Sequence, residues 1–376
     1  AAADRAPTEP GQAAAGHAGE YAELAGRLAL RLTAFLAIRS YDAERDQVLQ
    51  SATRCVRRHG TDALLARLLS AQFEAAGQRD RRAVLPDLAR ETLEAARRSG
   101  ERELELHALS QAARAARMRG DVGTAIQLLE EAVAAAREPG RHRMLLARAV
   151  ADLANTYLEA GRAGEAVPLY REALPVFRAE RRHRRVAQTL TTYAGALVER
   201  GELDAAEAAV GEALRITGEI GDEVGSAYVL LTGAQVLRAR GELAAAAERI
   251  ARATGELERL GNRSGIASAL RDGADIAVLD GRPGDALAAL RRGLALVREI
   301  DLPLEEARIL VRLRHAYRLT GDPEPADRYA AQLAERVDEL GLALASVRLP
   351  DYVAHAEASS LPEALDTCLQ TRPPDS

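Results

Sequence analysis

The stretch that decides the fold is YLEAGRAGEAVPLYREALP, residues 157–175. Gly161 separates two runs of helix-favouring residues, and Ala166 follows it five positions later. Glycine is favoured just past the end of a helix because that position prefers a left-handed backbone. The stretch therefore predicts one helix that ends near Gly161 and a second helix that starts directly after it, so that the two form a hairpin.

The same glycine and alanine recur along the chain with a period of about 40 residues. The pairs are Gly120 and Ala125, Gly161 and Ala166, Gly201 and Ala206, Gly241 and Ala246, Gly281 and Ala286, and Gly321 and Ala326. A second series lies half a period away, at Gly60, Gly100, Gly140, Gly221, Gly261 and Gly341. Between neighbouring glycines the apolar residues follow helical spacing. Each period is therefore expected to be one helix hairpin that stacks on the next.

Small residues mark where the two helices of a hairpin should cross closely, because bulky side chains would hold them apart. Alanine lies seven residues before the turn glycine at Ala113, Ala154, Ala194, Ala234 and Ala274. Arg314 takes this position in the last hairpin, where we expect either a splayed hairpin or an outward side chain.

Residues 157–166 and 170–175 closely resemble the tetratricopeptide repeat in its 40-residue form. The resemblance is strong from Glu101 to Leu342 and weaker from Tyr21 to Gly100. It implies an all-α protein, a right-handed α-solenoid of about eight tetratricopeptide-like hairpins. The expected divisions are a disordered linker at 1–20, degenerate hairpins at 21–100, a regular array at 101–342, and a capping helix with a disordered tail at 343–376.

The composition excludes several kinds of chemistry. All 51 basic residues among the 376 are arginine, so a P-loop lysine or a Schiff-base lysine is excluded. The two cysteines are far apart and the seven histidines form no metal-ligand motif, so we expect no cofactor, no metal and no enzymatic activity. A reducing cytoplasm is the expected location, because the sequence has neither a disulfide framework nor a membrane-spanning run.

In tetratricopeptide repeats the first helix of each hairpin lines the concave face. The resemblance therefore implies a polar groove that binds a peptide, a partner domain or a small anionic ligand through arginine. The candidate residues are Arg114, Arg148, Asn155, Gln188, Thr191, Tyr228, Gln235, Arg271, Asp275, Arg308 and His315. A solvated face with no ligand is the alternative. Arg271 and Arg308 are expected to be exposed.

Two arginine clusters between hairpins lie one repeat apart, and therefore on one edge of the solenoid. The residues of this basic docking edge are Arg141, Arg143, Arg181, Arg182, Arg184 and Arg185. The edge can dock an acidic partner domain or phosphate, or can be simply solvated. No aromatic residues alternate with these arginines, so direct nucleic-acid binding is not expected, and neither is membrane binding.

Residues 35–45, FLAIRSYDAER, resemble the segment that opens the repeat region of large bacterial transcriptional regulators of the SARP/STAND type. That resemblance implies a regulatory sensor attached to further domains, and the first methionine at Met118 suggests a piece of a longer protein. The alternative is a stand-alone scaffold that joins protein partners. Two copies can also associate through the early hairpins, where the run Leu64, Leu65, Leu68, Leu69 and Phe73 is either surface or core.

Overall fold

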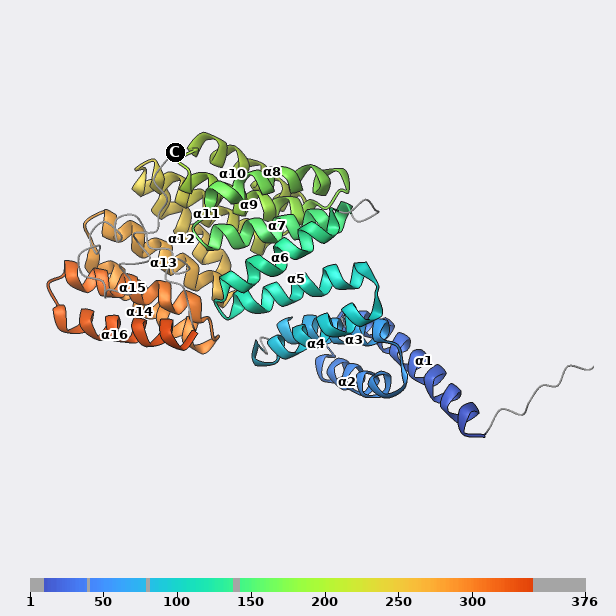
Figure 1. The fold of residues 1–376 in the computed structure, drawn as a ribbon. Coiled ribbons are helices and arrows are strands. Elements are labelled where there is room, and N and C mark those ends of the chain that lie inside the picture. Colours follow the sequence, from blue (N-terminus) through green and yellow to red (C-terminus); the bar gives the residue numbers. More distant parts are fainter. Residues whose placement is uncertain (1–9, 39–40, 79–81, 138–142, 341–376) are drawn as a thin grey trace, which may run out of the picture. The chain divides into compact units, whose positions relative to one another are not determined.

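The computed structural model describes residues 10–38, 41–78, 82–137 and 143–340, and the described part is helical throughout, without strands (Figure 1). The helices are α1 Pro10–Ile38, α2 Asp42–His59, α3 Asp62–Gln78, α4 Leu85–Ser99, α5 Arg102–Met118, α6 Val122–Ala136, α7 Arg143–Glu159, α8 Ala163–Ala179, α9 His183–Glu199, α10 Leu203–Glu219, α11 Glu223–Ala239, α12 Leu243–Arg259, α13 Arg263–Leu279, α14 Pro283–Glu299, α15 Pro303–Leu319 and α16 Pro323–Leu340. A short 3₁₀ helix, Arg82–Val84, leads into α4.

Seven pairs of successive helices pack on each other as hairpins, so the predicted all-α fold of helix hairpins is confirmed. The chain divides into two compact units, of which the first is 1–115 with 134–138 and the second is 116–133 with 139–376. Within the first unit α1 packs on α2 and α3 on α4, and within the second unit each odd-numbered helix from α7 packs on the even-numbered helix that follows it.

Left-handed backbone at the turns explains the glycine series. Gly161 and Gly201 both have φ of 73°, a conformation that costs other residues energy because their Cβ clashes with the carbonyl oxygen. In the half-period series Arg181 and Asp301 replace glycine, and both keep a positive φ, of 50° and 51°. The turn geometry is therefore maintained even where the sequence lacks the residue that adopts it most easily.

The hairpin crossings are closely packed at the predicted alanines. All six residues five after the turn glycine have 0% exposure; they are Ala125, Ala166, Ala206, Ala246, Ala286 and Ala326. Ala154 and Ala194, seven before the glycine, are equally buried. Larger side chains such as Tyr170 and Phe177 fill the layers between these crossings.

The ends of the array differ from expectation. Helix α1 begins at Pro10, inside the segment 1–20 expected to be a linker, because residues 13–15 are alanine, the strongest helix former. Arg314 is only 2% exposed, so its side chain does not point outward. The segment 343–376, expected to hold a capping helix and tail, lies outside the described residues.

The apolar run of the early hairpins belongs to the core of the first unit. Exposure is between 0% and 8% at each of its members, Leu64, Leu65, Leu68, Leu69 and Phe73. Of the two alternatives left open by the sequence, surface or core, the structure decides for core.

Ala206→Leu should lower the free energy of unfolding by about 1–3 kcal/mol, because added methyl groups at a closed crossing force neighbouring side chains out of place. Urea unfolding followed by circular dichroism measures the effect. Ala205→Leu is the matched control, since Ala205 is exposed on the same helix and its replacement should leave stability unchanged. Equal stability of both variants would show that the crossing at Ala206 tolerates large side chains.

Arg181→Gly should raise the free energy of unfolding by about 1 kcal/mol, because glycine adopts the left-handed turn without steric cost. Arg182→Gly removes the same charge at a residue with φ of −85°, so it should destabilise the protein slightly. Thermal unfolding of the two variants compares them directly, and the prediction is wrong if Arg181→Gly is the less stable of the pair.

Candidate functional site

The first helices of successive hairpins form one layer of the second unit. Each of α7, α9, α11 and α13 contacts the next odd-numbered helix directly. Residues at one repeat offset on these helices therefore face the same side of the layer, as the resemblance to tetratricopeptide repeats implied. Arg114 is separate from this layer, because it belongs to the first unit, where its guanidinium group pairs with Glu74 at 2.8 Å and stacks over Phe73.

A polar hollow of about 180 Å³ lies between α7 and α9. Three of the predicted groove residues line it, namely Arg148, Asn155 and Gln188. Arg185, which the sequence placed on the basic docking edge, lines the same hollow. The structure thus brings together residues from two predicted sites, because the first turn of α9 carries both the edge and the start of the groove.

Two guanidinium groups in this hollow have no carboxylate partner. Arg148 and Arg185 form no ion pair with any residue in the described part of the chain, and neither lies in the closed core. The hydroxyl of Tyr170 donates to Oδ1 of Asn155 at 2.8 Å, which fixes the orientation of the amide and leaves its N–H groups for a ligand. Arg148, Arg185 and the amide of Asn155 therefore present hydrogen-bond donors to the hollow, which the carboxylate of Asp152 also lines.

The sequence did not indicate the other residues of the hollow. Asp152, Thr189 and Thr192 add polar groups, and Phe177 from α8 forms an apolar wall. The sequence prediction used only a few fixed positions on the first helix of each hairpin, counted back from the turn glycine. It therefore could not identify side chains at other positions of that helix or on the second helix. Thr191, which was predicted for the groove, instead donates its hydroxyl to the carbonyl of Ala187 at 2.8 Å.

At α13 and α15 the predicted groove residues form a buried ionic network. The side chains of Arg271 and Arg308 are only 13% and 14% exposed, so the expectation that both are exposed is wrong. Arg271 contacts Asp272 and Glu305, and Arg308 contacts Glu305 at 2.5 Å. The cause is the carboxylate of Glu305, which attracts Arg271 from the neighbouring repeat and Arg308 from its own helix, so both arginines face it instead of solvent.

Asp275 and His315 are also buried, at 3% and 5% exposure. Both oxygens of Asp275 accept hydrogen bonds from Arg312, at 2.6 and 3.1 Å. Gln235 donates to Asp272 at 2.9 Å, and the hydroxyl of Tyr228 lies 3.2 Å from that of Ser264. Towards α15 the predicted groove residues thus pair with neighbouring side chains of the protein. At α7 and α9, in contrast, Arg148 and Arg185 line an open hollow and have no ion-pair partner among the described residues.

The network shifts the pKa values of its members. Burial alone would raise the pKa of Glu305, but Arg271 and Arg308 lower it to about 2. Burial alone would lower the pKa of Arg271, whereas Glu305 and Asp272 raise it above its ordinary value. Both groups are therefore charged across the physiological pH range, and their role is to join α13 to α15.

The basic docking edge is exposed where it is described. Arg143, Arg181, Arg182, Arg184 and Arg185 all have exposed side chains, and Arg184 pairs with Asp222 at 3.3 Å. Arg141 lies outside the described residues. No binding partner of this edge follows from its geometry, so docking there stays a prediction.

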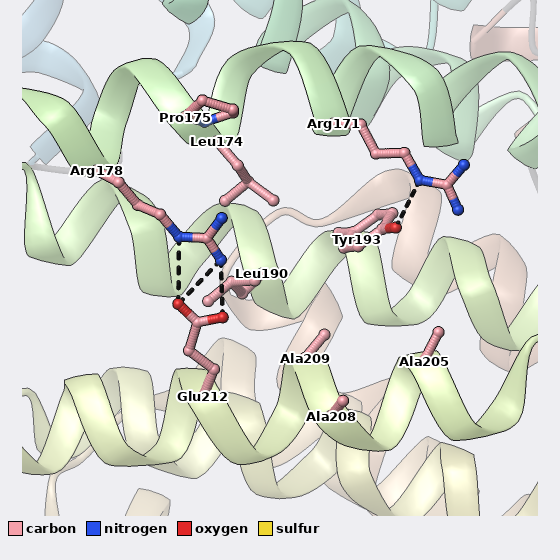
Figure 2. Close-up of a pocket in the computed structure, with 10 residues that line it drawn as sticks. All are labelled: Arg171, Leu174, Pro175, Arg178, Leu190, Tyr193, Ala205, Ala208, Ala209 and Glu212. Carbon is pink, nitrogen blue, oxygen red and sulfur yellow. Dashed lines mark hydrogen bonds and ion pairs between the residues drawn. The ribbon is translucent and has the colours of Figure 1, made fainter.

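A second hollow, of about 350 Å³, lies between α8, α9 and α10 (Figure 2). Its floor is apolar, with Leu174, Pro175 and Leu190 facing the alanines of α10. In contrast to the hollow between α7 and α9, its guanidinium groups have partners. The guanidinium group of Arg178 donates to both carboxylate oxygens of Glu212, at 2.7 and 2.9 Å. Arg171 donates to the hydroxyl of Tyr193 at 2.9 Å.

The described residues contain no group of three or more His, Cys, Asp or Glu side chains arranged to hold a metal ion. Among the same residues, no helix is both long enough and apolar enough to cross a bilayer.

The stacked hairpins and the polar face of their first helices define a helical-repeat protein. Residues 140–219 match the family model of the tetratricopeptide repeat. This segment covers α7 to α10, and the same hairpin continues at the same period to α16. The match confirms the predicted tetratricopeptide repeat for α7 to α10, and the later hairpins share its period. No curated protein matches the sequence at a significant level.

Several solved structures of other proteins have a similar fold. A Rap protein in complex with competence and sporulation factor is 14% identical, with a TM-score of 0.64 over 92% of this chain and 99% of that one. The apo quorum sensor NprR from B. thuringiensis is 16% identical, with a TM-score of 0.58 over 83% and 87% of the two chains. A STAND protein with a tetratricopeptide-repeat sensor, from Pyrococcus horikoshii, is 16% identical, with a TM-score of 0.53 over 92% of this chain and 51% of that one. At these identities the likeness shows the fold alone.

Glu305→Gln should lower the free energy of unfolding by about 3–5 kcal/mol at pH 7, because it removes the carboxylate that Arg271 and Arg308 share in a largely buried network. A carboxyl whose pKa is depressed in the folded state stabilises the protein fully above its unfolded pKa, near 4.5, and loses that contribution as the pH falls towards 2. The difference between variant and parent should therefore shrink over this acidic range.

Chemical denaturation at a series of pH values measures this difference. Glu219→Gln is the control, because Glu219 pairs with Arg215 on an exposed helix face and should contribute little. A destabilisation by Glu305→Gln that is no larger than that of the control would show that the network does not join α13 to α15.

Proposed function

We propose that the protein is a non-catalytic interaction module of the bacterial cytoplasm, and that the hollow between α7 and α9 binds an acidic side chain of a protein or peptide partner. The single observation that supports this most strongly is the pair Arg148 and Arg185, two arginines in one hollow with no described carboxylate partner. Elsewhere on the same layer arginines are paired, as Arg271 and Arg308 are. The hollow between α7 and α9 therefore differs from the far end of the same layer, where carboxylates occupy the arginines.

The ligand of this hollow is a carboxylate-bearing segment of a partner, which can be an attached regulator domain or a separate peptide. A small anionic molecule would satisfy the same arginines. The solved Rap structure contains a bound factor, and its fold resembles this one over most of both chains, which supports a peptide-sized ligand. Asn155 and Gln188 add amide groups that suit hydrogen bonds to an extended backbone.

The double variant Arg148→Ala/Arg185→Ala should weaken binding of an acidic peptide by about tenfold or more, because charge-assisted hydrogen bonds are among the strong polar contacts. The probe is a fluorescein-labelled peptide selected from an array of acidic heptapeptides for its binding to the parent protein, and anisotropy measures its affinity. Arg252→Ala is the matched control, since Arg252 is an exposed arginine on α12, remote in sequence from the hollow. Equal loss of affinity in control and double variant would refute the site.

A regulatory role is the second part of the proposal. The likeness in fold to NprR and to a STAND protein with a repeat sensor supports a sensor that acts on attached domains, while a stand-alone scaffold remains the competing function. A ligand in the hollow would act by favouring one curvature of the hairpin stack over another.

The regulatory role and the scaffold differ in what a deletion does. Removal of residues 143–340 from the full-length gene product should change the basal promoter output of a regulator. Unchanged output together with loss of partner capture would instead support the scaffold.

A further inference from the structure

The hollow between α8, α9 and α10 lies where the second helix of a hairpin carries a small residue (Figure 2). Eight residues after the turn glycine, α10 and α14 carry Ala209 and Ala289, whereas α12 and α16 carry Arg249 and Tyr329. A Cβ atom added to Gly233 of α11 would lie 2.5 Å from the guanidinium group of Arg249, so this long side chain occupies the equivalent space one repeat later. At Ala209 that space stays open, and its volume of about 350 Å³ is in the range of small-molecule sites.

The hollow is elongated and has an apolar floor. Leu174 and Pro175 of α8 and Leu190 of α9 face the alanines of α10 across it. Arg171 and Arg178 of α8 mark its two ends, and they lie about 10 Å apart along the helix, because each residue adds about 1.5 Å. An unbranched chain of methylene groups suits such a trough, since its contact with apolar side chains removes it from water.

The two ends of the hollow differ in charge. The end at Arg178 is electrically neutral, because its guanidinium group donates to both oxygens of Glu212. At the other end Arg171 lies 3.4 Å from the carboxylate of Glu202, but Arg200 contacts the same carboxylate at 2.6 Å. Two arginines share one carboxylate there, so the end at Arg171 has an excess of positive charge.

Tyr193 adds a second hydrogen-bond donor at the end near Arg171. Its hydroxyl oxygen accepts a hydrogen bond from Nε of Arg171 at 2.9 Å, and among the described residues its own hydrogen has no acceptor. The ring of Tyr193 lies 5.8 Å from the buried ring of Tyr170, which holds it in place. The hydroxyl can therefore donate to a carboxylate that also contacts the guanidinium group of Arg171.

We propose that this hollow binds a small carboxylate with an unbranched acyl chain, of the kind found in a medium-chain fatty acid. The chain lies on the floor of leucines and alanines, and the carboxylate binds Arg171 and the hydroxyl of Tyr193. The ion pair of Arg178 with Glu212 closes the far end and so limits the length of the chain. This site does not depend on the proposed peptide site between α7 and α9.

Isothermal titration calorimetry of the full chain with octanoate, up to about 10 mM, tests the site. The parent should bind octanoate saturably, and Arg171→Gln should weaken binding by about tenfold or more, because it removes the charge-assisted contact. Octanol keeps the chain but lacks the charge, so it should bind the parent far more weakly than octanoate. Absence of saturable binding, or equal binding to the parent and to Arg171→Gln, would overturn the proposal.

Ala208→Phe tests the location of the chain without changing any charge. Ala208 is exposed on α10 and lines the hollow, so the added ring should occupy the hollow and abolish octanoate binding. Ala288→Phe is the matched control, since Ala288 is exposed at the same repeat position of α14, where Ala251 of α12 takes the place of Arg171. The control should bind octanoate as the parent does, and equal effects of the two variants would overturn the assigned location.

The double variant Arg148→Ala/Arg185→Ala separates this site from the proposed peptide site. It should bind octanoate with the affinity of the parent, because neither arginine lines the hollow between α8 and α10. Loss of octanoate binding in the double variant would place the carboxylate between α7 and α9 and overturn the proposal.

Discussion

Close approach of two helices at an alanine is the constraint on which this structure depends. Five residues after each turn glycine a methyl group is all that the crossing accommodates, as the complete burial of Ala166 and Ala206 shows. Once that distance is set, the turn must be tight, and the left-handed residue at Gly161 or Gly201 provides it. Large side chains therefore occupy the layers between the crossings, where Tyr170 and Phe177 are buried. The low aromatic content follows from the same constraint.

Apolar packing joins neighbouring hairpins, as where Leu290 of α14 packs in one cluster with Leu310 of α15, and polar groups add contacts between repeats. Arginine is the only cationic side chain besides histidine, and it reaches across from one repeat to another, as in the pairs of Arg178 with Glu212 and of Arg292 with Glu258. Both pairs join residues 34 positions apart, with the order of charges reversed. The ion pair of Arg271 with Glu305 also joins residues of neighbouring repeats, but it lies in a largely buried network.

The proposed functional surface lies where this ionic pairing is incomplete. Arg148 and Arg185 line a hollow in which neither forms an ion pair with a described residue, so their hydrogen-bonding capacity is available to a ligand. At α13 and α15, in contrast, Arg271 and Arg308 form ion pairs with Glu305 of the same chain.

The sequence by itself determined the period, the hairpin boundaries, the position of the turns and the identity of the crossing residues. These depend on local backbone preference and on helical spacing, which act over a few residues and are repeated six times. The sequence also determined which residues lie on the first helices of the hairpins, because equivalent residues recur at the same distance from each turn glycine.

Only the tertiary structure decided which polar groups of that layer remain available. Arg271 meets Glu305 across 34 residues and Arg312 meets Asp275 across 37, so the partner of each charge lies on a neighbouring helix and depends on the stacking angle and on the rotamers of long side chains. The same limit applies to α1, whose apolar residues occur on two faces. Which face is buried depends on how Gly26 fits against Leu64, a contact between residues that are distant in the sequence.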